Sequence, residues 1–404
     1  MNLPLPLFDN LENLESTQID FSRYVKINID DFNQAKAFLS CYRGSQGTFN
    51  SYRREIERIL QWTFLVANKS LKSLNRTDIE TFIQFCQQPP VAWIGTIKLP
   101  RFIPKEGERI PNPEWRPFVV NVTKASRRLG TQPQVKQFNL SNGAIKEIFA
   151  ILSTFFNYLL QEDYVFSNPV ALIRQKSKFI LRHQTVTKIR RLSELQWQTV
   201  IETAHKMADE KPQTHEKTLF IMSILYSMYL RISELAASPR WTPAMNHFQR
   251  DNDGNWWFTT VGKGNKQREI AVSDAMLIVL KRWRKFLGLP SLPSPTDLSP
   301  LLPKKNGKDP ITSINYIRRI VQSCFDQAID ELKKEKSLEE EAELLMEATV
   351  HWLRHTGISD DVKHRPREHV RDDAGHSSGL ITDRYIDIDR RERHRSAKRK
   401  IIIQ

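Results

Sequence analysis

Residues 351–356 read His-Trp-Leu-Arg-His-Thr, and His376 and Tyr385 follow within the last fifth of the chain. A second arginine, Arg231, lies far upstream in the run Tyr-Leu-Arg-Ile-Ser-Glu-Leu over 229–235. Arginine donates two parallel hydrogen bonds to a phosphate and keeps its charge at any working pH. Two arginines, several imidazoles and one tyrosine are the groups needed to break and rejoin a phosphodiester without a metal ion.

The length and charge of the chain indicate its class. At 404 residues it is too long for one ordinary globular core, so two domains with insertions are expected. The formal net charge of +15 and the pI near 9.6 exceed what solubility requires. A hydrophobic content of 40% with 10% aromatic residues is typical of a globular protein rather than a disordered basic tail. The favoured partner is therefore a polyanion.

A membrane surface is the competing partner for such a basic chain. No apolar run approaches the roughly 20 residues of a spanning helix, and Met1 to Phe8 lacks the basic start of a signal peptide. The sequence therefore predicts a cytoplasmic protein without a membrane partner. Cys41, Cys86 and Cys324 are scattered, odd in number and without metal-ligand spacing. We expect buried thiols in a reducing compartment, and no metal or other cofactor.

Helical periodicity organises the first half of the chain outside one interval. Apolar residues recur at helical spacing over 48–68, where charged residues fill another face, and over 144–160, which predicts a core helix. A capping box at 77–80 predicts a further helix that ends before Pro89. Between 89 and 140 the pattern dissolves into prolines, tryptophans and basic residues, and no strong helix fits there.

The interval 89–140 is interpreted as a basic, proline-rich insertion. A solvated loop is the simplest interpretation of it. Cationic side chains with exposed aromatic residues also suit contacts to DNA phosphates or to a neighbouring protomer, and contacts to DNA are slightly favoured. Deleting roughly residues 94–133 is then expected to weaken DNA binding while preserving the fold.

The second half predicts a mostly helical domain with one β-hairpin. Helices are expected over roughly 193–208, 215–237, 273–286, 311–335 and 333–347, and in several pieces after residue 350. The helix over 333–347 is charged, and an insertion is one interpretation of it. The first of these begins with a capping box at 193–196. Two strand-like runs, 256–261 and 268–272, are joined by a Gly-Lys-Gly-Asn-Lys turn.

These patterns divide the chain into an N-terminal extension and two domains joined by a linker. The segments are 1–29 (extension), 30–173 (helical domain with the insertion 89–140), 174–192 (basic linker), 193–390 (second domain) and 391–404 (basic tail with an apolar end). The expected fold class is mainly α, with a second domain of α+β type that contains a small antiparallel sheet. The residues expected to contact DNA are Arg174, Lys176, Lys178, Arg182, Lys188, Arg190, Arg191 and Lys266.

The ordered set of motifs resembles the tyrosine recombinase (phage integrase) family. That family has an arginine in an apolar helix followed by Ser-Glu-Leu, a lysine in a Gly-Lys-Gly turn, His-x-Leu-Arg-His-Thr, Gly-His, and a tyrosine nine residues later. The matching residues here are Arg231, Lys263, His351, Arg354, His376 and Tyr385. The resemblance covers about 193–390, the catalytic domain, and 30–173 is only consistent with the family's helical core-binding domain. Residues 359–366 are unusually polar where the family often continues with an apolar helix.

The resemblance implies site-specific DNA recombination through a covalent intermediate. Tyr385 is then the nucleophile, which forms a 3′-phosphotyrosyl bond and frees a 5′-hydroxyl. Arg231 and Arg354 bind the phosphate, and Glu234 orients Arg231. Taken alone, the pair Arg231 and Glu234 is simply a salt bridge between residues three apart in a helix.

The remaining implied roles concern proton transfer and phosphate binding. His351 takes the phenol proton or holds the phosphate, and His376 donates a hydrogen bond to the same phosphate. Lys263 protonates the leaving 5′-oxygen, with Lys266 of the same turn as its rival. The family's position at His355 mostly supports structure.

The partners implied are double-stranded DNA with specific recombination sites and further copies of the chain. The family works as a tetramer on two sites, with a monomer or dimer on one, and accessory DNA-bending factors remain open. Neither ATP nor a metal is implied, and the expected location is the cytoplasm, on the nucleoid, as the product of a mobile genetic element. Two alternatives remain: a type IB topoisomerase, which shares this chemistry, and a non-catalytic DNA-binding regulator.

Overall fold

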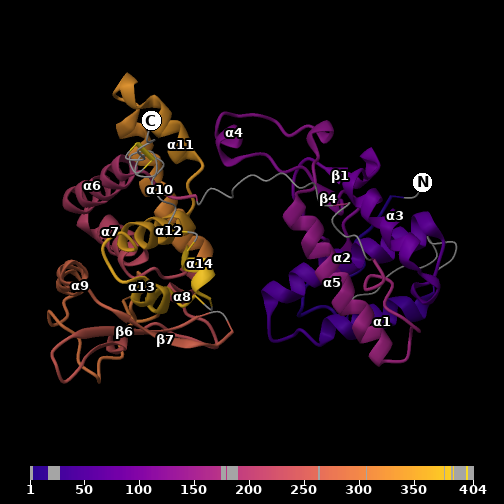
Figure 1. Cartoon of the computed structure of the whole chain (residues 1–404), viewed down its shortest axis with the longest axis horizontal. Coiled ribbons are helices and arrows are strands. Elements are labelled where there is room, and N and C mark those ends of the chain that lie inside the picture. The colour runs from indigo at the N-terminus through magenta and orange to yellow at the C-terminus, as the bar shows by residue number, and fades with distance from the viewer. Residues whose placement is uncertain are drawn as a thin grey trace, which may run out of the picture. The chain divides into compact units, whose positions relative to one another are not determined.

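The computed structural model describes residues 3–16, 28–173, 179, 190–262, 264–305, 307–376, 378–383, 385 and 397–398. The chain divides into two compact units, Met1–Thr185 and Val186–Gln404 (Figure 1). Lys263 of the predicted site lies outside the described residues, as do most of the linker, most of the tail and part of the N-terminal extension. The linker residues concerned are Arg174, Lys176, Lys178, Arg182 and Lys188.

Unit 1 is a bundle of helices around one hydrophobic core. Its longer helices are α1 (Ile29–Ser40), α2 (Gln46–Trp62, continued by a π-helical turn over Thr63–Ala67), α3 (Arg76–Gln87) and α5 (Asn142–Gln161). The predicted capping box at 77–80 is wrong by two residues, because Asn75 and Asp78 cap α3 instead. Buried apolar residues of all four helices form the core, among them Phe38, Ile56 and Phe155.

Among the described residues, α5 is the one helix long and apolar enough to cross a membrane by length and composition. The expectation that no apolar run approaches this length is therefore wrong for this helix. Its apolar residues, including Ile148, Leu152 and Phe156, are buried in the core of unit 1. Since core helices pass the same test, its composition is weak evidence for a membrane span.

The charged residues of α2 do not form a solvated face. Glu57 is buried; its carboxylate accepts a hydrogen bond from the backbone nitrogen of Leu7 (2.6 Å) and pairs with Arg101 of the insertion. Arg58 donates from Nη2 to the carbonyl oxygen of Pro117 (2.7 Å). Removing one partner of a buried charge leaves the other uncompensated, so these contacts tie the N-terminal extension and the insertion to α2.

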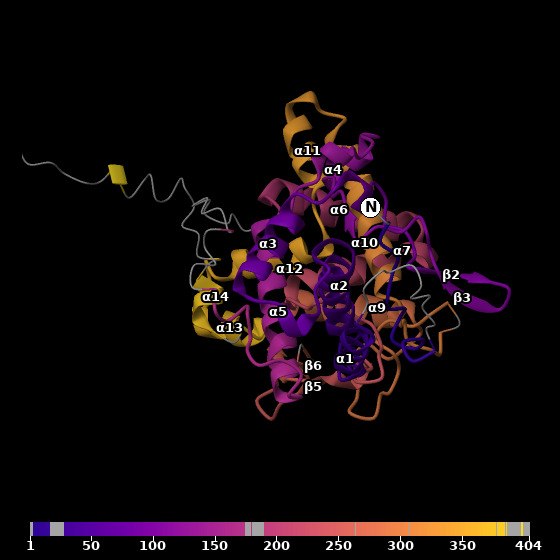
Figure 2. The ribbon, with the colours of Figure 1, turned by 90° about the vertical axis from the view of Figure 1, so that its right-hand side faces the viewer.

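The insertion 89–140 folds onto unit 1 and is not a free loop. Its elements are β1 (Ile94–Gly95), which pairs in parallel with β4 (Phe118–Val119), the antiparallel hairpin of β2 (Phe102–Lys105) and β3 (Glu108–Pro111), which projects from the unit in Figure 2, and the short helix α4 (Lys124–Arg128). Trp93 and Phe118 are buried in the core. Deleting residues 94–133 would open that core, so the structure contradicts the expectation that this deletion preserves the fold.

Unit 2 combines helices with one small sheet. Its helices are α6 (Glu194–Glu210), α7 (Pro212–Ser227), α8 (Ile232–Leu235), α9 (Asp274–Phe286), α10 (Ile314–Leu332), α11 (Glu339–Met346), α12 (Val350–Asp361), α13 (Arg367–Ala374) and α14 (Gly379–Asp383). The strands β5 (Phe248–Arg250), β6 (Trp256–Val261) and β7 (Gln267–Ala271) pair antiparallel in the order β5-β6-β7. The predicted hairpin is confirmed, whereas β5 was missed because its three residues are too few for a period of two.

The start of α6 has the predicted capping box. Ser193 Oγ accepts from the backbone nitrogen of Gln196 (3.1 Å), and Gln196 Oε1 accepts from the backbone nitrogen of Ser193 (2.9 Å). Ser193 Oγ also donates to the carboxylate of Glu341 (2.9 Å), so α11 packs on α6. The charged helix predicted over 333–347 is therefore a shorter element that belongs to the body of unit 2.

The helix predicted over 215–237 is wrong, because it is broken before Arg231. Helix α7 ends at Ser227, Tyr229 takes a left-handed backbone conformation with φ of +49°, and α8 begins at Ile232. Arg231 has an extended backbone (φ −76°, ψ 145°) at the N-cap of α8 rather than lying in a helix. Arg231 therefore lies between the two helices.

Helix α12 crosses α7 at backbone distance. A Cβ atom at Gly357 would lie 2.0 Å from the carbonyl oxygen of Tyr226, so no larger residue fits there without moving a helix. The crossing brings the motif at 351–356 next to the break after α7.

Two of the cysteines, Cys86 and Cys324, are buried as expected, but Cys41 is exposed, which corrects that expectation.

Candidate active site

The predicted arginines, histidines and tyrosine come from separate elements of unit 2 and converge. Helix α12 supplies His351, Arg354 and His355. The ring centroids of His351 and His355 are 4.3 Å apart, and those of His355 and Tyr385 are 5.3 Å apart. The ring of His376, which follows α13, stacks on Tyr385 with centroids 5.7 Å apart. Tyr385, three histidines and Arg354 therefore form one cluster.

Arg354 is buried at the centre of this cluster. Its Nη2 donates to the carbonyl oxygen of Ala374 (2.6 Å) and its Nη1 to that of Tyr229. Burial lowers the pKa of Arg354 to about 10, with smaller contributions from the charges of Arg231 and Arg268. The guanidinium therefore stays charged at neutral pH, and the two carbonyl groups fix its plane.

Arg231 belongs to a carboxylate-centred group that sequence patterns revealed only in part. Glu234 is buried and accepts from the backbone nitrogen of Arg231 (2.8 Å) and from its Nη1 (3.0 Å). Arg268 of β7 donates to both oxygens of the same carboxylate, each at 2.8 Å. Burial raises the pKa of Glu234, but the hydrogen bonds and charges of Arg268 and Arg231 together outweigh it, so the pKa is lowered and the carboxylate is ionised.

Arg268 is the residue of this group that we did not predict. It lies in the strand after the glycine-rich turn, where a lone charged residue gives no signal of its own. The side chain of Arg231 is 30% exposed, whereas that of Arg268 is 10% exposed. Glu234 therefore has a buried partner in Arg268 and a partly exposed partner in Arg231. The salt bridge considered from the sequence exists, and it still leaves Arg231 open to a ligand.

Gly375 permits the close approach of β7 to the end of α13. Its φ is +63°, and a Cβ atom there would lie 2.7 Å from Cδ of Arg268. Arg268 also donates from Nε to the carbonyl oxygen of Asp373 (3.0 Å). A glycine before His376 is therefore required both by its backbone conformation and by the space that Arg268 fills.

The imidazoles in the cluster are held neutral. Burial lowers the pKa of His355 to about 4, followed by His351, Arg354 and His376 as smaller causes. Burial also lowers the pKa of His376 to about 4, with the charges of Arg354 and Arg231 next, and its Nδ1 lies 2.9 Å from Thr382 Oγ1. The pKa of His351 is lowered too, first by burial and then by Arg354. Neutral rings can accept a proton at neutral pH.

His355 is the imidazole in direct contact with Tyr385. Its Nδ1 lies 2.5 Å from the hydroxyl oxygen of Tyr385, whose side chain is buried with Tyr229, Ile358 and Val370. The family resemblance implied mostly a structural role for His355, although it adjoins Arg354 in the sequence. The available signal was its spacing of four residues from His351, which puts both rings on one face of α12.

Three of the predicted DNA-contact residues, Arg190, Arg191 and Lys266, are among the described residues. Arg190 and Lys266 are exposed and Arg191 is half-buried. The turn that contains Lys266 closes through a hydrogen bond from the backbone nitrogen of Gly262 to the carbonyl oxygen of Lys266 (2.8 Å). Within the described residues no group of His, Cys, Asp and Glu has the geometry of a metal site.

A buried guanidinium, a second arginine on an ionised carboxylate, and neutral imidazoles around one tyrosine define a phosphoryl-transfer site of the tyrosine-nucleophile class. The chain belongs to the phage integrase family, whose model matches residues 190–392. It is a site-specific recombinase with a mainly α fold and small β-sheets.

Solved structures share this fold. The XerH site-specific recombinase bound to a palindromic difH substrate superposes with a TM-score of 0.55 at 14% identity, over 96% of this chain and 93% of that one. The Tn1549 transposon integrase in complex with transposon right end DNA gives a TM-score of 0.50 at 16% identity, over 91% of this chain and 98% of that one. At these identities the likeness concerns the fold alone. No curated protein sequence matches this one.

Proposed function

We propose that this recombinase cleaves and rejoins double-stranded DNA through a bond between Tyr385 and a 3′-phosphate. The observation that carries the proposal is the contact of the buried Tyr385 hydroxyl with a neutral imidazole, His355, beside the buried Arg354. The solved relatives are a recombinase and an integrase bound to DNA. Double-stranded DNA with specific sites is therefore the substrate, and the protein works in the cytoplasm, on the nucleoid.

The cleavage step transfers one phosphoryl group. The oxygen of Tyr385 attacks phosphorus, the bond from phosphorus to the 5′-oxygen breaks, and the phenol proton passes to Nδ1 of His355. Arg231 and Arg354 offset the charge on the nonbridging oxygens. The leaving 5′-oxygen takes a proton from Lys263. The phosphotyrosyl bond conserves the energy of the phosphodiester, so the 5′-hydroxyl of a partner strand can reverse the step without ATP.

His351 and His376 act on the phosphate in this scheme. Both rings are neutral at pH 7, so each has one N–H to donate to a nonbridging oxygen. His376 is oriented by Thr382, whose Oγ1 lies 2.9 Å from its Nδ1. Strand exchange needs two cleaved duplexes, so we propose a tetramer on two sites built from monomers or dimers on single sites.

His355→Ala is expected to slow cleavage by about 10²-fold or more while DNA binding stays unchanged, the usual size of a lost general base. Because the pKa of His355 is lowered to about 4, the base is present above that pH and is lost only as the pH falls through it. Single-turnover cleavage and binding are measured between pH 5 and pH 8, where His355 stays neutral and the wild-type rate should not fall through its protonation. His364→Ala, at an exposed histidine of the same unit, is the control. Equal cleavage rates for His355→Ala and His364→Ala would mean that His351, rather than His355, is the general base.

Covalent trapping tests the function itself. Protein is incubated with fragmented genomic DNA in EDTA, denatured, and the attached DNA is sequenced. A recombinase of this mechanism gives adducts concentrated at related pairs of sites, and EDTA leaves their yield largely intact. Scattered adducts with relaxation of any supercoiled plasmid would indicate a type IB topoisomerase, and no adduct from any DNA would indicate a non-catalytic regulator.

A further inference from the structure

Tyr229 has a backbone conformation that suits glycine. Its φ is +49°, in the left-handed region where a bulky side chain is a genuine outlier. The other described residues with positive φ that are not glycine are Asn68, Glu106, Asp163 and Asn265. Tyr229 differs from these because its side chain is fully buried. Such strain persists only where surrounding contacts enforce it.

The strained backbone serves both phosphate-binding arginines. The carbonyl oxygen of Tyr229 accepts a hydrogen bond from Nη1 of the buried Arg354. Two residues later the chain reaches Arg231 at the N-cap of α8. A relaxed backbone at Tyr229 would turn this carbonyl away from Arg354 and would change the exit direction of Arg231.

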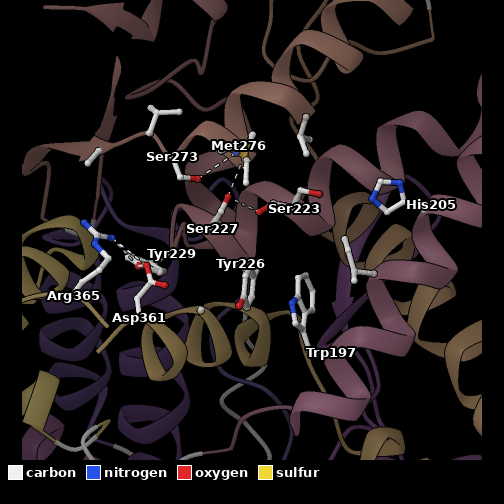
Figure 3. Close-up of a pocket in the computed structure, with 16 residues that line it drawn as sticks. Trp197, His205, Ser223, Tyr226, Ser227, Tyr229, Ser273, Met276, Asp361 and Arg365 are labelled. Atoms are coloured by element: carbon white, nitrogen blue, oxygen red, sulfur yellow. Dashed lines mark hydrogen bonds and ion pairs between the residues drawn. The ribbon is translucent and has the colours of Figure 1, made fainter. Parts of the chain in front are cut away.

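The hydroxyl of Tyr229 is anchored on the far side of the residue. It donates to Oδ2 of Asp361 and accepts from Nη1 of Arg365 (3.1 Å), at one end of a cavity of about 520 Å³ (Figure 3). Burial and then the charge of Asp361 raise the pKa of Tyr229, so the hydroxyl keeps its proton. Asp361 and Arg365 belong to the polar stretch 359–366 that departs from the family pattern, and their polarity serves this contact with Tyr229.

A second series of contacts connects Asp361 and Arg365 with Arg231 and Glu234. Arg365 Nη2 donates to Oδ2 of Asp373 (2.6 Å), and the carbonyl oxygen of Asp373 accepts from Nε of Arg268 (3.0 Å). Arg268 in turn holds the carboxylate of Glu234. Contacts therefore run from the Tyr229 hydroxyl to both arginines without a gap.

We propose that Tyr229 is a positioning residue: anchored through its hydroxyl to Asp361 and Arg365, it holds the left-handed turn that aims Arg354 and Arg231 at the scissile phosphate. The proposal rests on the recombinase activity proposed above and adds a residue outside the matched motifs. Its role is to keep a strained turn in place, whereas a packing role would depend only on the volume of its ring.

The two roles predict opposite orders for two substitutions. Tyr229→Phe keeps the ring and the strain but loses the anchor, so cleavage is expected to slow about tenfold with DNA binding unchanged, the size of one lost hydrogen bond. Tyr229→Gly loses the ring, yet glycine takes this φ without strain. Its cleavage rate per folded molecule should exceed that of Tyr229→Phe, although its Tm is the lower of the two because of the cavity. Slower cleavage by Tyr229→Gly than by Tyr229→Phe would overturn the proposal.

Tyr226→Phe is the matched control. Tyr226 lines the same cavity and donates to a carboxylate, Oδ2 of Asp360 (3.1 Å), but it lies in the helical backbone of α7. We expect its cleavage rate to stay within about twofold of wild type, because this half-buried hydrogen bond does not hold a strained backbone conformation in place. A loss equal to that of Tyr229→Phe would mean that any hydroxyl of the cavity matters and would contradict the special role of Tyr229.

A readout without DNA separates this proposal from the recombinase activity. If Tyr229 is strained, Tyr229→Gly should have a higher Tm than Tyr229→Ala, even though alanine fills more of the cavity. A higher Tm for Tyr229→Ala would overturn the strain argument, whatever the protein does to DNA. An absent adduct from the wild-type protein would instead remove the proposed activity and leave the Tm comparison standing.

Discussion

Tyr385→Phe is expected to abolish covalent attachment of the protein to DNA, because in the proposed mechanism only the phenolic oxygen attacks phosphorus. The phenyl ring keeps the stacking on His376 and the packing in a site where the residue is 8% exposed, so fold and DNA binding stay nearly intact. The measurement is a denaturing gel of the protein with a nicked substrate from which the cleaved fragment escapes. We expect no adduct above background.

The control is Tyr316→Phe, at a half-buried tyrosine of α10 in the same unit. It removes one hydroxyl from a surface helix and should give the wild-type yield of adduct. A full yield from Tyr385→Phe would mean that another residue is the nucleophile. Loss of adduct from both variants would indicate damage to folding or binding, which a binding assay on the intact duplex would detect.

Sequence patterns predicted which residues of unit 2 the structure brings together in the candidate site, because the motif is an ordered set of chemically unusual residues. The same patterns gave the positions of α6, α5 and the hairpin of β6 and β7, whose periodicity or capping signals are local. Arg354 and Tyr385 are recognised by their residue type and their order in the motif. An error in the predicted ends of a helix does not affect either criterion. These patterns report only local structure. The residues that they missed make contacts between segments that are distant in the sequence.

The break between α7 and α8 shows this limit. The run over 215–237 has continuous helical periodicity, and nothing local marks Tyr229 as left-handed, since its anchor, Asp361, is more than a hundred residues away. Arg268 was missed for the same reason, because its partner Glu234 lies in another element. In unit 1 the sequence shows only that charged residues fill one face of α2, and tertiary partners, such as Arg101 for Glu57, reveal that part of this face is buried.

Arg231→Ala and Arg354→Ala are each expected to lower the cleavage rate by about 10²–10³-fold, the usual cost of removing a donor that acts on transition-state charge. The two should differ in stability. Arg354 is buried, and its loss leaves the carbonyl groups of Tyr229 and Ala374 without their donor, so its Tm falls. Arg231 is partly exposed and Glu234 keeps Arg268, so Arg231→Ala should unfold near the wild-type temperature.

The contrast with the basic surface separates catalysis from binding. Arg190→Ala removes an exposed cation that is expected to contact DNA, so it should weaken binding and reduce the salt slope of the affinity by about 1, with little change in the rate of the bound complex. Single-turnover rates at saturating protein, with Tm for each variant, are the measurements. Equal and modest losses of rate for all three variants would contradict phosphate binding by Arg231 and Arg354. A large loss of rate in Arg231→Ala at unchanged Tm and affinity is the outcome that structural damage cannot produce, because Glu234 keeps both hydrogen bonds from Arg268 in that variant.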